Sequence, residues 1–354
     1  MKRSISWLVG GLLCAQNATA WKWHGYSTQG DATPVVSFAT GKKGWVRVIG
    51  DTVYIMGTYA GDWGGTLSLP TTATVPSSSA DLGASPYTNT YLAAYDRRTG
   101  RYAWWMWFYL STASAWGTDL SVLPDGTVLT LLITAPWGCS YGYRDSTGFS
   151  SSGSIDATVY NGDRASFLVK ITPTLGAAPV VSSASVGTYS LSGNGSVDLK
   201  HIFVQGNAIY TSGSYRQGTN PQGFGVNGVM NLLSLLVTGA PNAEQALLVA
   251  FDLNLTYLNA ARLGNVTPPF GAARGHQVVP FPGGPNRLAW LVEVENHGPG
   301  PLLVQYRSTS GSLAGLGTLD TSLRAIEVSS PSLAFQGWHY LAKVTRLGES
   351  PCIR

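Results

Sequence analysis

Short runs in which apolar and polar residues alternate recur along the chain. Val53 and Ile55 mark one such run, and Ile209 belongs to another. A period of two residues is typical of a β-strand. Turn signals such as Pro124-Asp125-Gly126 and Gly283-Gly284 separate the runs at the places where hairpins need them. The pattern therefore predicts an all-β fold.

Two phrases recur at fixed spacing. The first phrase contains a glycine turn and occurs as IGDTVYIMGTY at 49–59, LPDGTVLTLLI at 123–133 and QGNAIYTSGSY at 205–215. The second follows it as YLAAYDRRTG at 91–100, FLVKITPTLG at 167–176 and LLVAFDLNLT at 247–256. Weaker copies at 283–313 and 330–348 bring the number of units to five.

Units that cannot bury both of their faces alone are typical of a β-propeller, in which four-stranded blades pack side by side. The fifth unit leaves little sequence for its last strand, whereas WKWHGYSTQGD at 21–31 looks like a strand. We expect this N-terminal strand to close the ring and hide its open edges. The predicted blades of this single domain are 32–110, 111–190, 191–268, 269–319, and 320–354 with 21–31.

Residues 1–20 predict a signal peptide and a secreted or cell-surface protein. Lys2 and Arg3 precede an apolar run, and Ala18-Thr19-Ala20 fits a cleavage site. Lipoprotein anchoring at Cys14 is the alternative, and it is disfavoured because Leu13 stands where that pattern wants a small residue. No later segment is long and apolar enough to predict a transmembrane span.

Charged residues make up only 11% of the chain, below the usual share of about 25%. The scattered Lys and Arg residues argue against a nucleic-acid partner, which requires clustered cations. No CxxC or Cys/His spacing predicts a metal site, and no motif predicts a cofactor. A disulfide between Cys139 and Cys352 stays open, and so does the oligomeric state.

The repeated phrases GDTVYIMGTY, YLAAYDRRTG with the following Trp104, and GNAIYTSGSY resemble the bacterial secreted propeller repeats known as SBBP repeats. The resemblance covers most of residues 44–265. It implies a propeller fold and a surface location, but it implies no reaction.

Candidate ligand-binding residues fall into two groups. If the innermost strand begins each blade, its start carries polar residues that face one central opening: Lys43, Asp119, Asp198, Lys200, His201, Arg274, His276 and Arg324. Aromatic residues beside loop glycines form the second group: Trp63, Trp116, Trp137 and Tyr141. Each group also has a bland interpretation, as solvated strand ends and as caps of the blades.

The preferred function is a binding module for a glycan, envelope component or extracellular protein, which uses the loop aromatics and the insertions 60–90, 138–165 and 214–246. A carbohydrate-active enzyme with its site at the central channel is one alternative, and a structural subunit of an extracellular assembly is another. No catalytic residue is predicted. Glu293 and Glu295 share one face of a strand, but such a pair is more often the wet side of an edge strand.

Overall fold

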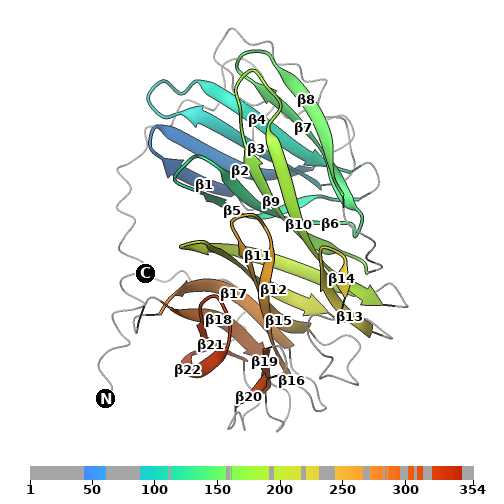
Figure 1. Ribbon diagram of the computed structural model, residues 1–354, viewed down its shortest axis with the longest axis vertical. Helices are drawn as coiled ribbons and strands as arrows, with labels where there is room; N and C mark the ends of the chain where they lie inside the picture. Colours follow the sequence, from blue (N-terminus) through green and yellow to red (C-terminus); the bar gives the residue numbers. More distant parts are fainter. Residues whose placement is uncertain are drawn as a thin grey trace.

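A computed structural model describes residues 44–60, 88–110, 113–156, 160, 162–190, 195–216, 221–230, 244–265, 272–281, 284, 286–295, 302–306, 309–313 and 321–344. These residues form 22 strands in four antiparallel sheets, and no helix is found among them (Figure 1). The predicted all-β fold is confirmed. Within the same residues, no helix is therefore available to cross a membrane.

Sheet A starts with four consecutive strands. They are β1 (Gly44–Ile49), β2 (Thr52–Ala60), β3 (Thr88–Asp96) and β4 (Tyr102–Tyr109). Two strands from farther along the chain, β7 (Gly138–Asp145) and β8 (Ser150–Asp156), extend the sheet beyond β4.

Sheets B and C repeat this plan. The four main strands of sheet B are β5 (Trp116–Val122), β6 (Val128–Thr134), β9 (Ala165–Thr172) and β10 (Val180–Ser190), and β13 (Pro221–Val226) and β14 (Val229–Met230) extend it. Those of sheet C are β11 (Ser196–Gln205), β12 (Ala208–Arg216), β15 (Glu244–Asp252) and β16 (Tyr257–Asn265), and β19 (Leu302–Tyr306) and β20 (Thr309–Leu313) extend it.

Sheet D corrects the expected number of blades. It contains β17 (Ala272–Pro280), β18 (Arg287–Glu295), β21 (Thr321–Ser329) and β22 (Phe335–Val344). Because β18 pairs with β21 along its whole length, the predicted fourth and fifth units are two halves of one sheet. The described residues therefore form four sheets instead of five, and the proposed closing strand at 21–31 lies outside them.

One topological rule explains why the strands of sheet D look like two units in the sequence. The segment between the second and third strands of a unit contains a hairpin that pairs with the fourth strand of the preceding sheet. In this way β7 pairs with β4, β13 with β10, and β19 with β16. The insertions at 138–165 and 214–246, expected to be loops, thus contain strands, and the copy at 302–313 is an insertion of the same kind.

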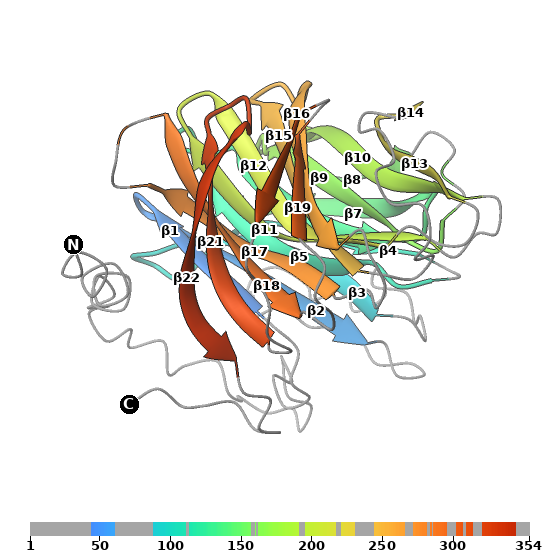
Figure 2. The same ribbon diagram turned by 90° about the horizontal axis from the view of Figure 1, so that it is seen from below.

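The sheets stack in the order A, B, C, D, and sheets A and D lie at opposite ends of the stack (Figures 1 and 2). Apolar side chains fill the space between consecutive sheets. Strand β6 is apolar almost throughout because both of its faces are covered: Val128 and Leu132 face sheet A, whereas Leu129 and Leu131 face sheet C.

The repeated glycines lie in equivalent turns. Gly50, Gly126 and Gly206 each connect the first and second strands of a sheet, with φ angles of 57°, 85° and 57°. Residues with a Cβ rarely adopt such positive φ angles, which explains why glycine recurs at these positions. The sequence spacing therefore reports the position of each first hairpin.

The aromatic run in β4 alternates between two faces, as the strand period requires. Trp104, Met106 and Phe108 pack toward sheet B, whereas Trp105 and Trp107 lie on the opposite face of sheet A with ring centroids 4.6 Å apart. All five side chains are buried.

Candidate functional site

Six predicted site residues lie on the first strands of three consecutive sheets. They are Trp116 and Asp119 on β5, Asp198 and His201 on β11, and Arg274 and His276 on β17. Strand β11 contacts both β5 and β17. Each of the three strands carries a bulge near these residues, and bulges re-aim the side chains beside them.

We use the name polar track for these residues together with the charged side chains that contact or neighbour them. The polar track comprises Arg47, Trp116, Asp119, Arg164, Asp198, His201, Glu244, Arg274, His276, Glu293 and Glu295. The inner-strand polar residues of sheets B, C and D thus lie on neighbouring strands and contact charged or aromatic side chains.

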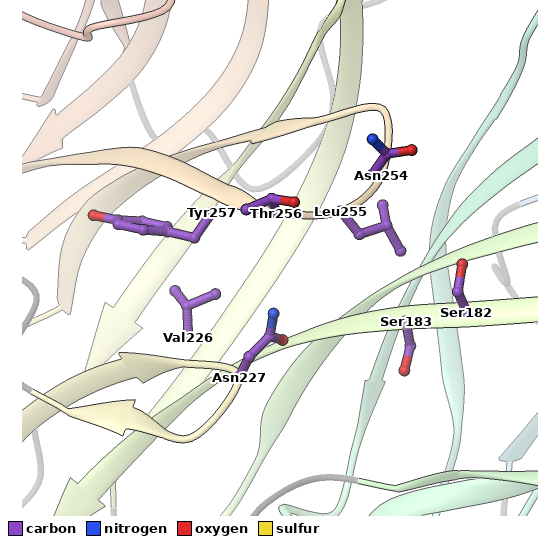
Figure 3. A pocket seen from close by; sticks show the side chains of 8 residues that line it. All are labelled: Ser182, Ser183, Val226, Asn227, Asn254, Leu255, Thr256 and Tyr257. Carbon is purple, nitrogen blue, oxygen red and sulfur yellow. The ribbon is translucent and has the colours of Figure 1, made fainter.

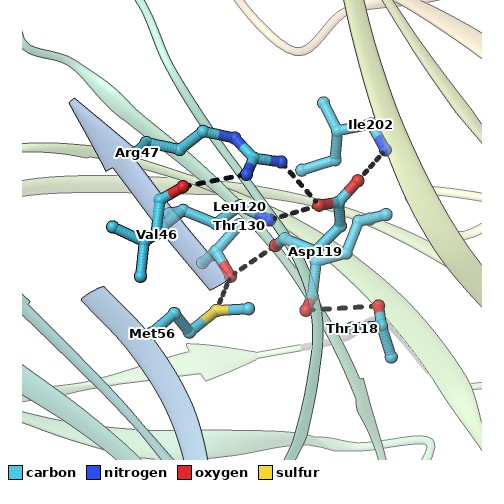
Figure 4. Close-up of polar contacts among 9 residues, drawn as sticks. Val46, Arg47, Met56, Thr118, Asp119, Leu120, Thr130 and Ile202 are labelled. Atoms are coloured by element: carbon cyan, nitrogen blue, oxygen red, sulfur yellow. Dashed lines mark hydrogen bonds and ion pairs between the residues drawn. The ribbon is translucent and has the colours of Figure 1, made fainter. Parts of the chain in front are cut away.

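Asp119 connects three sheets (Figure 4). Its Oδ1 accepts a hydrogen bond from the Leu120 N–H at 2.8 Å and lies 3.4 Å from Nη2 of Arg47 on β1. Its Oδ2 accepts from the N–H of Ile202 on β11 at 2.7 Å. Burial raises the pKa of Asp119, although these donors oppose the rise. Because both oxygens have protein partners, Asp119 acts as a structural joint.

Only one of the two carboxylate oxygens of Asp198 has a partner among the described residues. Its Oδ2 lies 3.1 Å from Nη2 of Arg164, and the Arg164 guanidinium lies 5.9 Å from the centre of the Trp116 ring. Its Oδ1 is buried and has no hydrogen-bond partner among the described residues. Burial raises the pKa of Asp198 against the opposing effect of Arg164. Buried acceptors without a partner are rare in native proteins, and this one marks Asp198 as a candidate for a functional role.

Arg274 gathers three carboxylates. Its Nε lies 2.7 Å from Oε2 of Glu244, and its Nη1 lies 3.2 Å from Oε1 of Glu293 and 3.6 Å from Oε2 of Glu295. Burial alone would lower the pKa of Arg274, but the three carboxylates together raise it. The predicted shared face of Glu293 and Glu295 is confirmed, because both reach the same guanidinium.

Two histidines continue the polar track between sheets C and D. The His276 Nε2 lies 3.3 Å from Oε2 of Glu293, and the His201 and His276 rings have centroids 6.1 Å apart. These two residues come from different first strands, so sequence spacing could only suggest that they meet.

The expected position of Arg324 is wrong. It lies on β21, the third strand of sheet D, because β21 pairs with β18 and does not begin a blade. Arg324 is buried, and its guanidinium packs 4.7 Å from the ring centre of Trp338 and 5.4 Å from that of Tyr340. It belongs to the packing of sheet D and not to the polar track.

The loop assignment of the aromatic residues also changes. Trp116 is the first residue of β5, and Tyr141 lies inside β7, where it pairs with Phe108 of β4. Tyr141 is a strand residue because the insertion at 138–165 forms a hairpin, and Trp116 is one because β5 begins there. Trp137 does lie in a turn and is 60% exposed. Two further candidates, Lys43 and Trp63, fall outside the described residues.

A cavity that the sequence did not suggest lies between sheets B and C (Figure 3). Its volume is about 450 Å³, and its polar lining comes from Ser182, Ser183, Asn227, Asn254, Thr256 and Tyr257. We call it the B–C pocket. In the sequence, Asn254-Leu255-Thr256 is a glycosylation sequon at the end of the repeated phrase 247–256, and no repeat or spacing marks the other lining residues.

Cys139 is a free buried thiol in the core between sheets A and B. Burial raises its pKa to about 12, so the thiol stays protonated and unreactive near neutral pH. Cys352 lies outside the described residues. In the part of the chain that the structure describes, no three His, Cys, Asp or Glu side chains are grouped as metal ligands.

Comparison with protein-family models, curated proteins and solved structures gives no match for this chain. The functional argument therefore depends on the geometry of the polar track and of the B–C pocket.

Proposed function

We propose that the chain is a secreted or cell-surface binding module related to β-propellers, and that the polar track contacts a glycan, an envelope component or an extracellular protein. The predicted signal peptide at 1–20 and the resemblance of most of residues 44–265 to secreted propeller repeats support this proposal. The stacked four-stranded units, with neighbouring first strands in contact, are also what a propeller-type scaffold requires.

The unpartnered Oδ1 of Asp198 is the observation that carries the proposal. A buried carboxylate oxygen without a hydrogen bond costs free energy, commonly about 1–3 kcal/mol. A ligand hydroxyl or amine that donates to this oxygen recovers that cost. Since Arg164 already holds Oδ2, the carboxylate is fixed in position before a ligand arrives.

The surroundings of Asp198 favour a polar ligand with an apolar face. Trp116 offers an aromatic ring beside Arg164, and sugar rings and aromatic or aliphatic side chains pack on such rings. Around Arg274, three carboxylates outnumber one guanidinium. The polar track thus presents acceptors for hydroxyl or amine groups and repels anionic ligands.

The enzyme alternative has weaker support. Asp119 has protein donors on both oxygens, and Glu244, Glu293 and Glu295 all contact Arg274. A glycosidase needs one carboxyl group free to donate a proton and a second free to attack or to activate water. In this structure the four carboxylates are therefore occupied by protein partners.

The test is a binding screen of the purified mature chain against a glycan array and against envelope fractions of the organism that produces it. The wild-type protein should bind at least one fraction or glycan. Asp198→Asn and Trp116→Ala should each weaken that binding at least tenfold. Asp51→Asn is the matched control, because Asp51 is exposed and pairs with Arg98 in a turn at the far end of sheet A.

Circular dichroism and thermal melting should show that the Asp198→Asn protein stays folded. Unchanged binding by both track variants would refute the proposed contact region. Hydrolysis of a polysaccharide that disappears in Asp198→Asn would instead establish the enzyme alternative.

A further inference from the structure

The B–C pocket lies at the other end of the sheets from the polar track. Strand β15 begins at Glu244, which contacts Arg274 of the track, and it ends next to the turn that carries Asn254 and Thr256. A strand of this length spans about 27 Å at about 3.4 Å per residue. The pocket is therefore a separate site, with its own lining and its own chemistry.

The lining of the pocket is neutral and rich in hydrogen-bonding groups. Ser182, Ser183 and Thr256 provide hydroxyls, and Asn227 and Asn254 provide amides. Tyr257 adds an aromatic ring at one side, as Figure 3 shows. No charged residue belongs to this lining. Its volume of about 450 Å³ lies within the range of about 300–1,000 Å³ that small-ligand sites occupy.

The wall that carries Asn227 is held in place. The Asn227 Oδ1 accepts a hydrogen bond from the Ser185 N–H at 2.8 Å, and the Asn227 N–H donates to the Ser185 carbonyl at 2.9 Å. This pairing fixes the amide so that its NH₂ group is directed toward the turn of Asn254 (Figure 3). Asn227 has a φ of 49°, a conformation that Asn tolerates better than most residues do.

The opposite wall is equally fixed. The Asp252 Oδ1 accepts from the N–H groups of Asn254 at 2.8 Å and Thr256 at 2.7 Å. The Lys170 Nζ donates to the Leu253 carbonyl at 2.8 Å, which ties this turn to β9. Leu255 is buried in the core between sheets B and C. Binding a ligand between two preformed walls costs little ordering entropy.

At the corresponding place between sheets A and B, hydrogen bonds join the two turns. There the Asp145 Oδ2 accepts from the Gly176 N–H, and the Tyr143 hydroxyl donates to the Thr174 carbonyl at 3.3 Å. The β7–β8 turn is thus bonded directly to the turn between β9 and β10. A hairpin turn and a neighbouring turn also meet at the B–C junction, but there they enclose the pocket.

We propose that the B–C pocket binds a neutral sugar residue of a glycan. A sugar ring presents several hydroxyls that both donate and accept, which matches amides and hydroxyls on opposing walls. Its apolar face can pack on Tyr257, with Val226 and Leu255 as the apolar part of the lining. Anionic sugars find no cation in the lining, and a purely apolar ligand would leave the amides without partners.

This inference deepens the proposed binding function, but it uses a different site, so the two can fail separately. The test is saturation-transfer NMR followed by titration calorimetry with glucose, galactose, mannose, N-acetylglucosamine and their β-1,4-linked disaccharides. Glucuronic and galacturonic acids serve as anionic probes. The protein should come from a host that does not glycosylate sequons, so that Asn254 stays unmodified.

At least one neutral sugar should bind, and neither uronic acid should bind as tightly. The double variant Asn254→Ala/Thr256→Val removes two polar groups at exposed positions, and Ser182→Trp places a large side chain at an exposed position of the lining. Each should raise the Kd at least tenfold. Asn207→Ala is the matched control, because Asn207 lies exposed in the β11–β12 turn outside the pocket.

Wild-type affinity in both pocket variants would overturn the inference, and so would the absence of neutral-sugar binding by the wild-type protein. Sugar binding that is lost in Asp198→Asn and kept in the pocket variants would assign the sugar to the polar track, which refutes the pocket site and supports the proposed function.

Discussion

The junctions between sheets A and B and between sheets B and C have the same topology, but the contacts between their turns differ. At the A–B junction, the β7–β8 hairpin lies beside the turn between β9 and β10. At the B–C junction, the β13–β14 hairpin lies beside the turn between β15 and β16. At the A–B junction, Asp145 bonds one turn to the other. At the B–C junction, the corresponding residues Asn227 and Asn254 line a cavity. One repeated scaffold thus forms a structural joint at one place and a space for a ligand at the next.

The difference lies in side chains at the turns, because the cores are alike. Both junctions bury continuous clusters of aliphatic and aromatic residues. Asp145 is fully buried and accepts hydrogen bonds from Thr147, Phe149 and Gly176. Asn227 accepts one backbone hydrogen bond, from Ser185 within its own sheet. A carboxylate that reaches across the junction closes it, whereas an amide that bonds within its sheet leaves it open.

The largest expected effect comes from the cores. Trp104 is buried between sheets A and B, with the Tyr54 and Tyr143 ring centroids 6.3 Å and 6.1 Å away. Trp104→Ala should lower the free energy of unfolding by about 3–5 kcal/mol, measured by chemical denaturation. Phe251→Ala in the B–C core should cost a similar amount. A much smaller loss for Phe251→Ala would mean that the junctions already differ in their cores.

The next effect separates the two turns. Asp145→Ala leaves the N–H groups of Thr147, Phe149 and Gly176 without their acceptor and should cost about 2–3 kcal/mol. Asn227→Gly is the matched change at the B–C junction, because glycine accepts the φ of 49° and only one hydrogen bond is lost. It should cost about 1 kcal/mol. Equal losses would contradict the view that only the A–B turns are locked together.

The Asp145 effect should depend on pH. Burial alone would raise the pKa of Asp145, but hydrogen bonds from Thr147, Gly176 and Phe149 lower it overall. A lowered pKa in the folded state contributes stability above the unfolded value of about 3.9, and this stability is lost as the pH falls through the folded value. The difference in unfolding free energy between wild type and Asp145→Asn should therefore be constant from pH 7 to 5 and shrink below pH 4.

The smallest effect on the free energy of unfolding is expected at exposed side chains in turns. Trp137→Ala and Asn254→Ala change exposed turn positions, one beside each junction, and each should alter the free energy of unfolding by less than about 0.5 kcal/mol. Thermal melting of the two variants beside Trp104→Ala provides the measurement. If Trp137→Ala lowered the free energy of unfolding nearly as much as Trp104→Ala, Trp137 would be a packing residue and not a side chain available to a binding partner.

Sequence spacing predicted the parts of the fold that are local. Alternation predicted the strands, and Gly50, Gly126 and Gly206 marked three equivalent turns because only a residue without a Cβ readily takes their φ angles. It also placed Asp119, Asp198 and Arg274 on first strands. Their approach to one another depends on how sheets stack, and the arginine partners of the two aspartates, Arg47 and Arg164, were not foreseen.

Strand pairing between distant segments was decided by the tertiary structure. Residues 302–313 repeat the apolar pattern of a blade, yet they pair with β16, and this choice makes β18 and β21 neighbours and moves Arg324 away from the polar track. An edge strand offers the same backbone hydrogen bonds to any partner, so the apolar pattern of one segment does not identify the strand with which it pairs. The B–C pocket depends on the same pairing, because β10, the β13–β14 hairpin and the β15–β16 turn meet only after the sheets have assembled.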